Sequence, residues 1–72
     1  MYEWVPISSS WVAAAAYERE GERILVEFND GARIWYGECT PINWEEFMAP
    51  GQSKGQYVHQ VLEGHPYGRL EG

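Results

Sequence analysis

The strongest pattern of hydrophobic and polar positions lies in residues 23–38, RILVEFNDGARIWYGE. β-Branched and aromatic residues stand on both sides of the tripeptide Asn-Asp-Gly at 29–31. Asn, Asp and Gly accept the backbone conformations of tight turns, so this tripeptide is a turn signal. The pattern predicts an antiparallel hairpin with strands at about 23–29 and 32–38.

The length of the turn decides the register of this hairpin. A two-residue loop would place Phe28 opposite Arg33 and would mix a charge into the apolar face. A three-residue loop, with Gly31 left-handed in a bulge, makes one face wholly apolar. That register pairs Phe28 with Ala32, Val26 with Ile34, and Ile24 with Tyr36. We therefore predict the three-residue loop.

The other face of the hairpin is predicted to pair Glu27 with Arg33 as ions, and Leu25 with Trp35. Large apolar side chains on a sheet face that meets water usually lie beneath another segment or another chain. Leu25, Arg33 and Trp35 are therefore a candidate surface for a partner. The alternative is that the N-terminal residues Tyr2, Trp4 and Val5 simply cover the pair of Leu25 and Trp35.

The stretch that precedes the hairpin is ambiguous between a helix and a strand. Ser10 is able to cap a helix that would run through four alanines. The stretch is apolar on every side, however, and a helix of that kind would need burial all round. Since a hairpin alone is marginally stable in water, we predict a third strand at about 11–18.

Two short helices are predicted after the sheet. Thr40 followed by Pro41 is typical of an N-cap and a first helical position, so a helix is expected at about 41–49. A Ser-x-x-Gln capping-box pattern that begins at Ser53 opens a second helix at about 54–63. The predicted fold class is α+β, in which a three-stranded antiparallel sheet carries both helices on one face within a single domain.

Charge and composition narrow the function. The chain has 72 residues and a formal net charge of −6, which disfavours bulk nucleic-acid binding because the chain repels phosphate backbones. No segment approaches the roughly 18 uninterrupted apolar residues that a membrane span needs. The N-terminus lacks the pattern of a secretory signal, and Cys39 is the only cysteine. A cytoplasmic location is therefore expected.

The segment GQSKG at 51–55 is the main candidate for binding chemistry. Glycines and a lysine at the start of a helix suit an anion, and residues 51–60 contain no acid. The order of residues differs from that of a phosphate-binding loop, so nucleotide hydrolysis is not expected. The alternatives are a simple helix cap and a true anion site. The candidate ligand-binding residues are Ser53, Lys54, Gly55 and Tyr57, together with Ser9, Ser10 and Trp11.

Little in the sequence indicates catalysis or metal binding. His59 has no carboxylate in the sequence pattern that would orient it as a base. Cys39, His59 and His65 do not have the spacing of metal ligands. We expect no catalytic residue, no metal site and no cofactor.

The chain resembles the KTSC domain family in four motifs. They are ISSSWVAAAAY at 7–17, LVEFNDG at 25–31, IWYG at 34–37 followed by Pro41, and SKGQYVHQVL at 53–62. The family is named for the C-terminus of some lysyl-tRNA synthetases and also occurs as free-standing small proteins of bacteria and phages. The resemblance spans residues 5–70 and implies a strand at 11–17.

The sequence departs from the family's pattern at two places. Ala16 stands where the family often has glycine, and Val58-His59 stand where it commonly has phenylalanine and asparagine. The resemblance implies no established chemistry, because the function of the family is poorly defined.

Three functions remain open. The first is a non-catalytic interaction module that binds a protein partner or associates with itself through exposed aromatic residues. The second is a module that sequesters or senses a small anionic ligand, such as a nucleotide, at Lys54, with the ring of Trp11, Trp35 or Tyr57 stacked on the ligand. The third is association with RNA or tRNA. Only the occurrence of the family in lysyl-tRNA synthetases suggests it, and the negative net charge of the chain opposes it.

Overall fold

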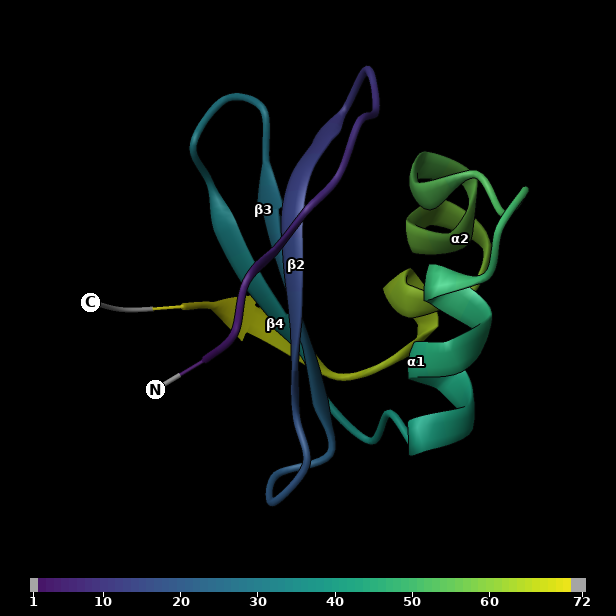
Figure 1. Ribbon diagram of the computed structural model, residues 1–72. Helices are drawn as coiled ribbons and strands as arrows, with labels where there is room; N and C mark the ends of the chain where they lie inside the picture. Colours follow the sequence, from purple (N-terminus) through teal and green to yellow (C-terminus); the bar gives the residue numbers. More distant parts are fainter. Residues whose placement is uncertain (1, 71–72) are drawn as a thin grey trace.

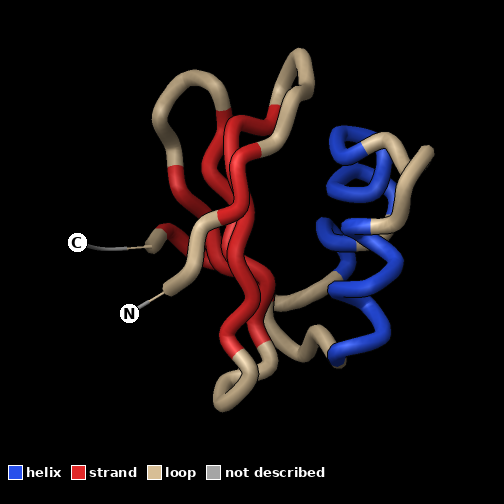
Figure 2. The backbone as a smooth tube through the Cα atoms, in the orientation of Figure 1, coloured by secondary structure: helices blue, strands red, loops and turns tan. Residues whose placement is uncertain are grey.

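The computed structural model describes residues 2–70 and forms two layers, a five-stranded antiparallel sheet and a pair of helices that cover one of its faces (Figure 1, Figure 2). The strands follow one another across the sheet in chain order. They are β1 (Val5–Pro6), β2 (Val12–Glu18), β3 (Arg23–Phe28), β4 (Arg33–Tyr36) and β5 (Tyr67–Arg69). The helices are α1 (Pro41–Met48), α2 (Lys54–Gln60) and the 3-10 turn η1 (Leu62–Gly64).

The α+β class, the three central strands and the two helices are confirmed, but the predicted number of strands is wrong. The sequence pattern gave three strands, and the sheet has five. β1 and β5 are only two and three residues long, which is too short to show an alternating pattern. They form because they pair with the outer backbone groups of β2 and β4, which would otherwise lack partners in the sheet.

The predicted register of the central hairpin is confirmed. The backbone N–H of Phe28 donates to the carbonyl of Ala32 at 2.8 Å, and Val26 lies opposite Ile34. Gly31 has a φ of +93°, the left-handed conformation that the three-residue loop requires. The side chain of Asp30 accepts a hydrogen bond from the N–H of Ala32 at 3.0 Å and so holds the turn closed.

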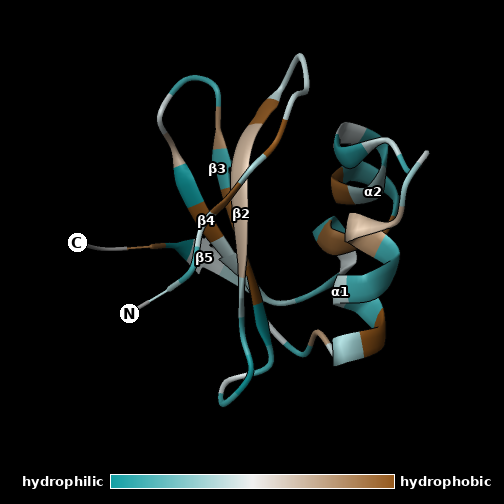
Figure 3. Cartoon of the chain, in the orientation of Figure 1, coloured by the Kyte–Doolittle hydropathy of each residue, from teal (hydrophilic) through white to brown (hydrophobic). Residues whose placement is uncertain are grey.

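The apolar face that this register creates is the inner face of the sheet and packs against the helices. Figure 3 shows where the hydrophobic residues fall along the strands and along α1 and α2. The core combines side chains from β2, β3 and β4 with side chains from both helices. Its largest fully buried members are Phe47, Ile24, Leu62, Val12, Val26 and Val58. Because the sheet alternates sides at each residue, Leu25 belongs to the outer face and not to this core.

Each helix begins as the sequence predicts, and the second helix ends earlier. The side chain of Thr40 accepts from the N–H of Asn43, and the side chain of Asn43 accepts from the N–H of Thr40 in return. Ser53 accepts from the N–H of Gln56 at 3.3 Å. The segment predicted as one helix at 54–63 is α-helical only to Gln60 and then tightens into η1.

The outer face of the sheet is closed by aromatic and cationic side chains of the chain itself. Leu25 is completely buried, with Ala16 and Trp35 as its cross-strand neighbours. The guanidinium of Arg33 lies 4.9 Å from the centre of the Trp4 ring, and it also pairs with Glu27 at 3.0 Å. Arginine on the face of a tryptophan is a favourable contact.

Gly68 completes this outer face because it gives the ring of Trp35 room to lie across β5. A Cβ atom at position 68 would stand 2.8–2.9 Å from three atoms of the Trp35 indole. Glycine therefore permits an approach that no other residue allows.

Within the described residues 2–70, no helix has the length and apolar character that crossing a membrane requires.

We predict that Gly68→Ala destabilises the fold by about 1 to 3 kcal/mol, because a rigid indole has to move to admit the new methyl group. The free energy of unfolding, measured by urea titration, tests this. Gly64→Ala is the matched control, since a Cβ there meets nothing within 4 Å. Equal stability of the two variants would contradict the packing of Trp35 on Gly68.

Candidate functional site

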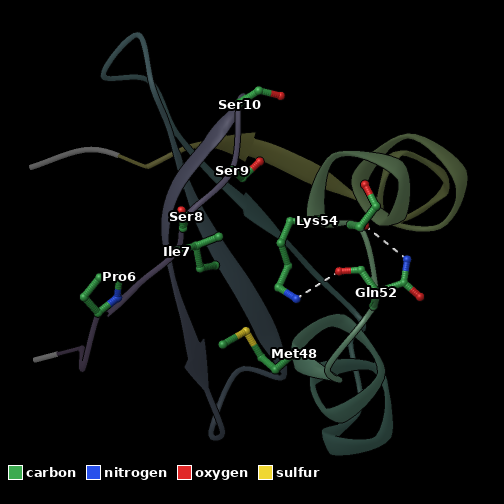
Figure 4. A pocket seen from close by; sticks show the side chains of 9 residues that line it. Pro6, Ile7, Ser8, Ser9, Ser10, Met48, Gln52 and Lys54 are labelled. Carbon is green, nitrogen blue, oxygen red and sulfur yellow. Dashed lines mark hydrogen bonds between the residues drawn. The ribbon is translucent and has the colours of Figure 1, made fainter.

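A cleft of about 480 Å³ opens between the segment that joins β1 to β2 and the segment that joins α1 to α2 (Figure 4). Nine residues line it: Pro6, Ile7, Ser8, Ser9, Ser10, Met48, Gln52, Ser53 and Lys54. Four of the seven predicted ligand-binding residues, Ser9, Ser10, Ser53 and Lys54, therefore meet at one place. Pro6, Ile7, Ser8 and Met48 belong to the cleft without having been predicted, and Gln52 lies in the predicted segment 51–55 without having been named as a ligand-binding residue.

The serine run forms one wall of the cleft and is held by its own hydrogen bonds. The hydroxyl of Ser9 accepts from the N–H groups of Trp11 and Val12, each at 3.2 Å. The side-chain amide of Asn29 donates to the carbonyl of Ser9 at 3.1 Å. Ser8 and Ser10 are exposed, and no hydrogen bond of their hydroxyls is found within the described chain. These two hydroxyls are the groups of this wall that remain available to a ligand.

Lys54 forms the opposite wall and sends its amine into the cleft (Figure 4). Nζ donates to the carbonyl of Gln52 at 3.1 Å and lies 5.8 Å from the centre of the Phe47 ring. An ammonium group has three N–H donors, so two remain after the bond to Gln52. Lys54 is also the only charged residue among the described residues that line the cleft.

The start of α2 acts as a helix cap, and the cleft is a separate feature beside it. Ser53 caps the helix through the N–H of Gln56, although the return bond of a complete capping box is not among the bonds of the described residues. The Lys54 side chain turns back to the Gln52 carbonyl, which gives its charge a partner next to the helix start. The helix-cap alternative therefore accounts for Ser53, while the amine of Lys54 still faces the cleft.

Trp11 and Gly55 are outside the cleft, which corrects the predicted set. One face of the Trp11 ring stacks on His59 at 4.7 Å between ring centres, and Phe28 packs against it at 4.9 Å. A Cβ at position 55 would stand 3.2 Å from this same ring, so Gly55 makes room for Trp11. Trp11 is still 36% exposed, but its ring already packs against His59 and Phe28 and does not line the cleft.

Tyr57 is also outside the cleft, because it joins the two helices. Its hydroxyl lies 3.0 Å from the Glu46 carboxylate and 3.2 Å from the carbonyl of Asn43, both on α1. Its ring packs against Phe47 at 5.4 Å. Burial raises the pKa of the Tyr57 hydroxyl, so the hydroxyl stays protonated and donates to α1. Tyr57 therefore has a structural role in this arrangement.

The Cys39 and His65 side chains lie close together in a closed environment. Cys39 is completely buried, and its sulfur lies 3.7 Å from Nδ1 of His65. That nitrogen is also 3.0 Å from the carbonyl of Gly37, so we assign it a proton that it donates to this carbonyl. Burial raises the pKa of the Cys39 thiol, which opposes formation of a thiolate nucleophile. Within residues 2–70, no three His, Cys, Asp or Glu side chains are placed to hold a metal ion.

Of the predicted partner surface, the structure removes Leu25 and leaves the other two residues accessible in part. Leu25 has no exposed area and cannot touch a partner in this fold. Trp35 is half-buried over Gly68, and Arg33 is exposed beside Trp4. Trp4 of the N-terminal segment thus lies over Arg33.

Comparisons with known proteins identify the fold. A family model described as the KTSC domain matches residues 8–67, which include the motifs at 25–31 and 53–62. The crystal structure of a KTSC domain protein from Yersinia pestis superposes with a TM-score of 0.88 at 19% sequence identity, and the match covers 99% of this chain and 100% of that one. At this identity the structural likeness concerns the fold alone. None of the curated proteins compared with the chain matches it.

We predict that Tyr57→Phe lowers the free energy of unfolding by about 1 kcal/mol, because the bond from its hydroxyl to α1 is lost while the ring packing stays. Urea titration measures the change. Tyr67→Phe, which removes an exposed hydroxyl, is the control and should leave stability unchanged. If both variants unfold like the original protein, Tyr57 does not join the helices as described.

Proposed function

The chain belongs to the KTSC domain family, and on the fold of this family we propose that the cleft beside Lys54 holds a small anion, so that the protein acts as a non-catalytic binding module. The observation that carries the proposal is the charge of the cleft. The chain has a net charge of −6, yet the only charged group among the described residues that line this cleft is an ammonium with two unused donors.

The groups around Lys54 favour a phosphate or carboxylate ligand. Ser8 and Ser10 lie on the segment across the cleft from Lys54 and offer further hydroxyl donors, and donors from two segments suit an anion with several oxygens (Figure 4). Ile7 and Met48 add apolar contacts at the wall of the cleft. Lysine binds anions as a point charge, so the site accepts anions of different shapes.

A base or other ring on the ligand has less support than its anionic part. Trp11 and Tyr57, two of the predicted stacking residues, are engaged with the protein's own side chains. Trp35 lies on the outer face of the sheet, over Gly68, and does not line the cleft. We therefore propose that the cleft recognises a phosphate or carboxylate group. A nucleotide, as predicted from the sequence, is one of several molecules that carry such a group.

The other predicted functions remain predictions. Binding of a protein partner through Arg33 and Trp35 is weakened as a proposal, because Leu25 is buried and Trp4 lies on Arg33. Association with RNA or tRNA is opposed by the net charge. The positive charge of Lys54 in the cleft favours anion binding over both of these functions.

We predict that saturating phosphate or a small polycarboxylate such as citrate raises the melting temperature of the protein. At a hundredfold excess over Kd the gain is about 2.7 kcal/mol, which for a domain of this size is roughly 10 °C or more. Lys54→Gln should abolish the shift, because it removes the charge and keeps most of the side-chain volume. Thermal denaturation at constant ionic strength, with nucleoside phosphates included in the panel, is the measurement.

Arg19→Gln is the matched control for this experiment. It removes one positive charge from an exposed position at the far end of β2 from the serine run, so it should retain the shift. No shift with any anion, or an equal shift in the Lys54 and Arg19 variants, would refute the proposed site.

A further inference from the structure

The two edges of the sheet differ in what they offer to another strand. At β1, the N–H of Ile7 donates to the carbonyl of Ala13, so the backbone of Pro6 faces outward. Proline has no N–H, and a proline on an edge protects it from pairing. The edge at β5 has no such protection within the described residues. Gly37 donates to the carbonyl of Pro66 at 2.6 Å, and Leu70 donates to the carbonyl of Arg33 at 2.9 Å.

These two bonds fix the direction of the β5 backbone. Since Pro66 and Leu70 face β4, alternation along the strand turns the N–H and C=O groups of Tyr67 and Arg69 away from it. Both residues are exposed, and Tyr67 retains 63% of its accessible surface. A row of two free donors and two free acceptors therefore lies along this edge of the sheet.

We propose that β5 pairs antiparallel with β5 of a second copy of this chain, about a two-fold axis at Gly68. The free groups are self-complementary in this register, because Tyr67 of each copy then lies opposite Arg69 of the other. Each such pair exchanges two backbone hydrogen bonds, so the two pairs give four. The two sheets become one continuous sheet of ten strands.

The charged residues near the β5 edge favour a second copy of this chain as the strand that pairs with β5. Tyr67 and Arg69 lie on the inner face of the sheet, opposite Tyr36 and Ile34. A pocket of about 320 Å³ adjoins them, and its lining residues are Ile34, Tyr36, Glu63 and Tyr67. Glu63 is the only charged one among these; its side chain is about half exposed, and its Oε2 lies 3.2 Å from Nδ1 of His59 on α2.

An arginine is the complement of this pocket. In the proposed register, Arg69 of the second copy comes to lie beside the Tyr67 ring, and its long side chain extends toward Glu63. A guanidinium pairs well with a carboxylate and with an aromatic face. Each copy supplies Arg69 to the pocket of the other copy, so the contact is made twice. Each contact places a positive charge beside Glu63 of a chain whose net charge is −6. The interface is small, so the dimer is expected to be weak.

The test is the molecular mass by sedimentation equilibrium from about 10 µM to 1 mM, the range in which so small an interface is expected to associate. The original protein should move from monomer to dimer across this range. Arg69→Pro should stay monomeric to the highest concentration, because it removes an outward N–H and no bond to β4. Arg69→Ala, which keeps the N–H, should weaken association less than Arg69→Pro does.

A charge exchange tests the proposed partner of Arg69. Glu63→Arg and Arg69→Glu should each weaken the dimer at least tenfold, and the double variant should restore it. Amide exchange in the unaltered protein gives a second readout that no folding defect affects: exchange at Tyr67 and Arg69 should slow as concentration rises. A monomer at 1 mM, a dimer that survives Arg69→Pro, or a double variant no better than the single ones would each overturn the proposal.

Discussion

The register of the β3–β4 hairpin is the constraint on which the rest of the structure depends. Gly31 takes a left-handed conformation, and the loop therefore has three residues. Because side chains alternate between the two faces of a sheet, a slip of one residue would send Val26 and Ile34 to opposite sides. The observed register places both on the inner face, where they form part of the dry surface that receives the helices.

The two faces of the sheet solve the burial problem of a small domain in different ways. The inner face is covered by α1 and α2, and Tyr57 holds those helices together. Within residues 2–70 no helix covers the outer face, where Arg23 lies over the ring of Trp35 and Arg33 lies over the ring of Trp4. A short chain gains stability by using both faces in this way, since its single core is small. The cleft beside Lys54 lies between the segment that joins β1 to β2 and the segment that joins α1 to α2.

Local patterns in the sequence were sufficient to predict the three central strands, the hairpin register and the start of each helix. These features depend on residues that are neighbours along the chain, such as Thr40 with Asn43. β1 and β5 were not predicted because they have no sequence pattern of their own. They are strands because they pair with β2 and β4. The site was predictable in part for the same reason. Ser53 and Lys54 carry a local signal, whereas the exclusion of Trp11 depends on a stack with His59 that only the fold creates.

The most direct test of this account is a set of nuclear Overhauser effects between Hα atoms across the β3–β4 hairpin. Residues in non-hydrogen-bonded antiparallel pairs have the closest Hα atoms. The observed register predicts strong effects between Leu25 and Trp35, and between Glu27 and Arg33. Strong effects between Phe28 and Arg33, and between Val26 and Trp35, would instead show a two-residue loop and would contradict the arrangement of both faces.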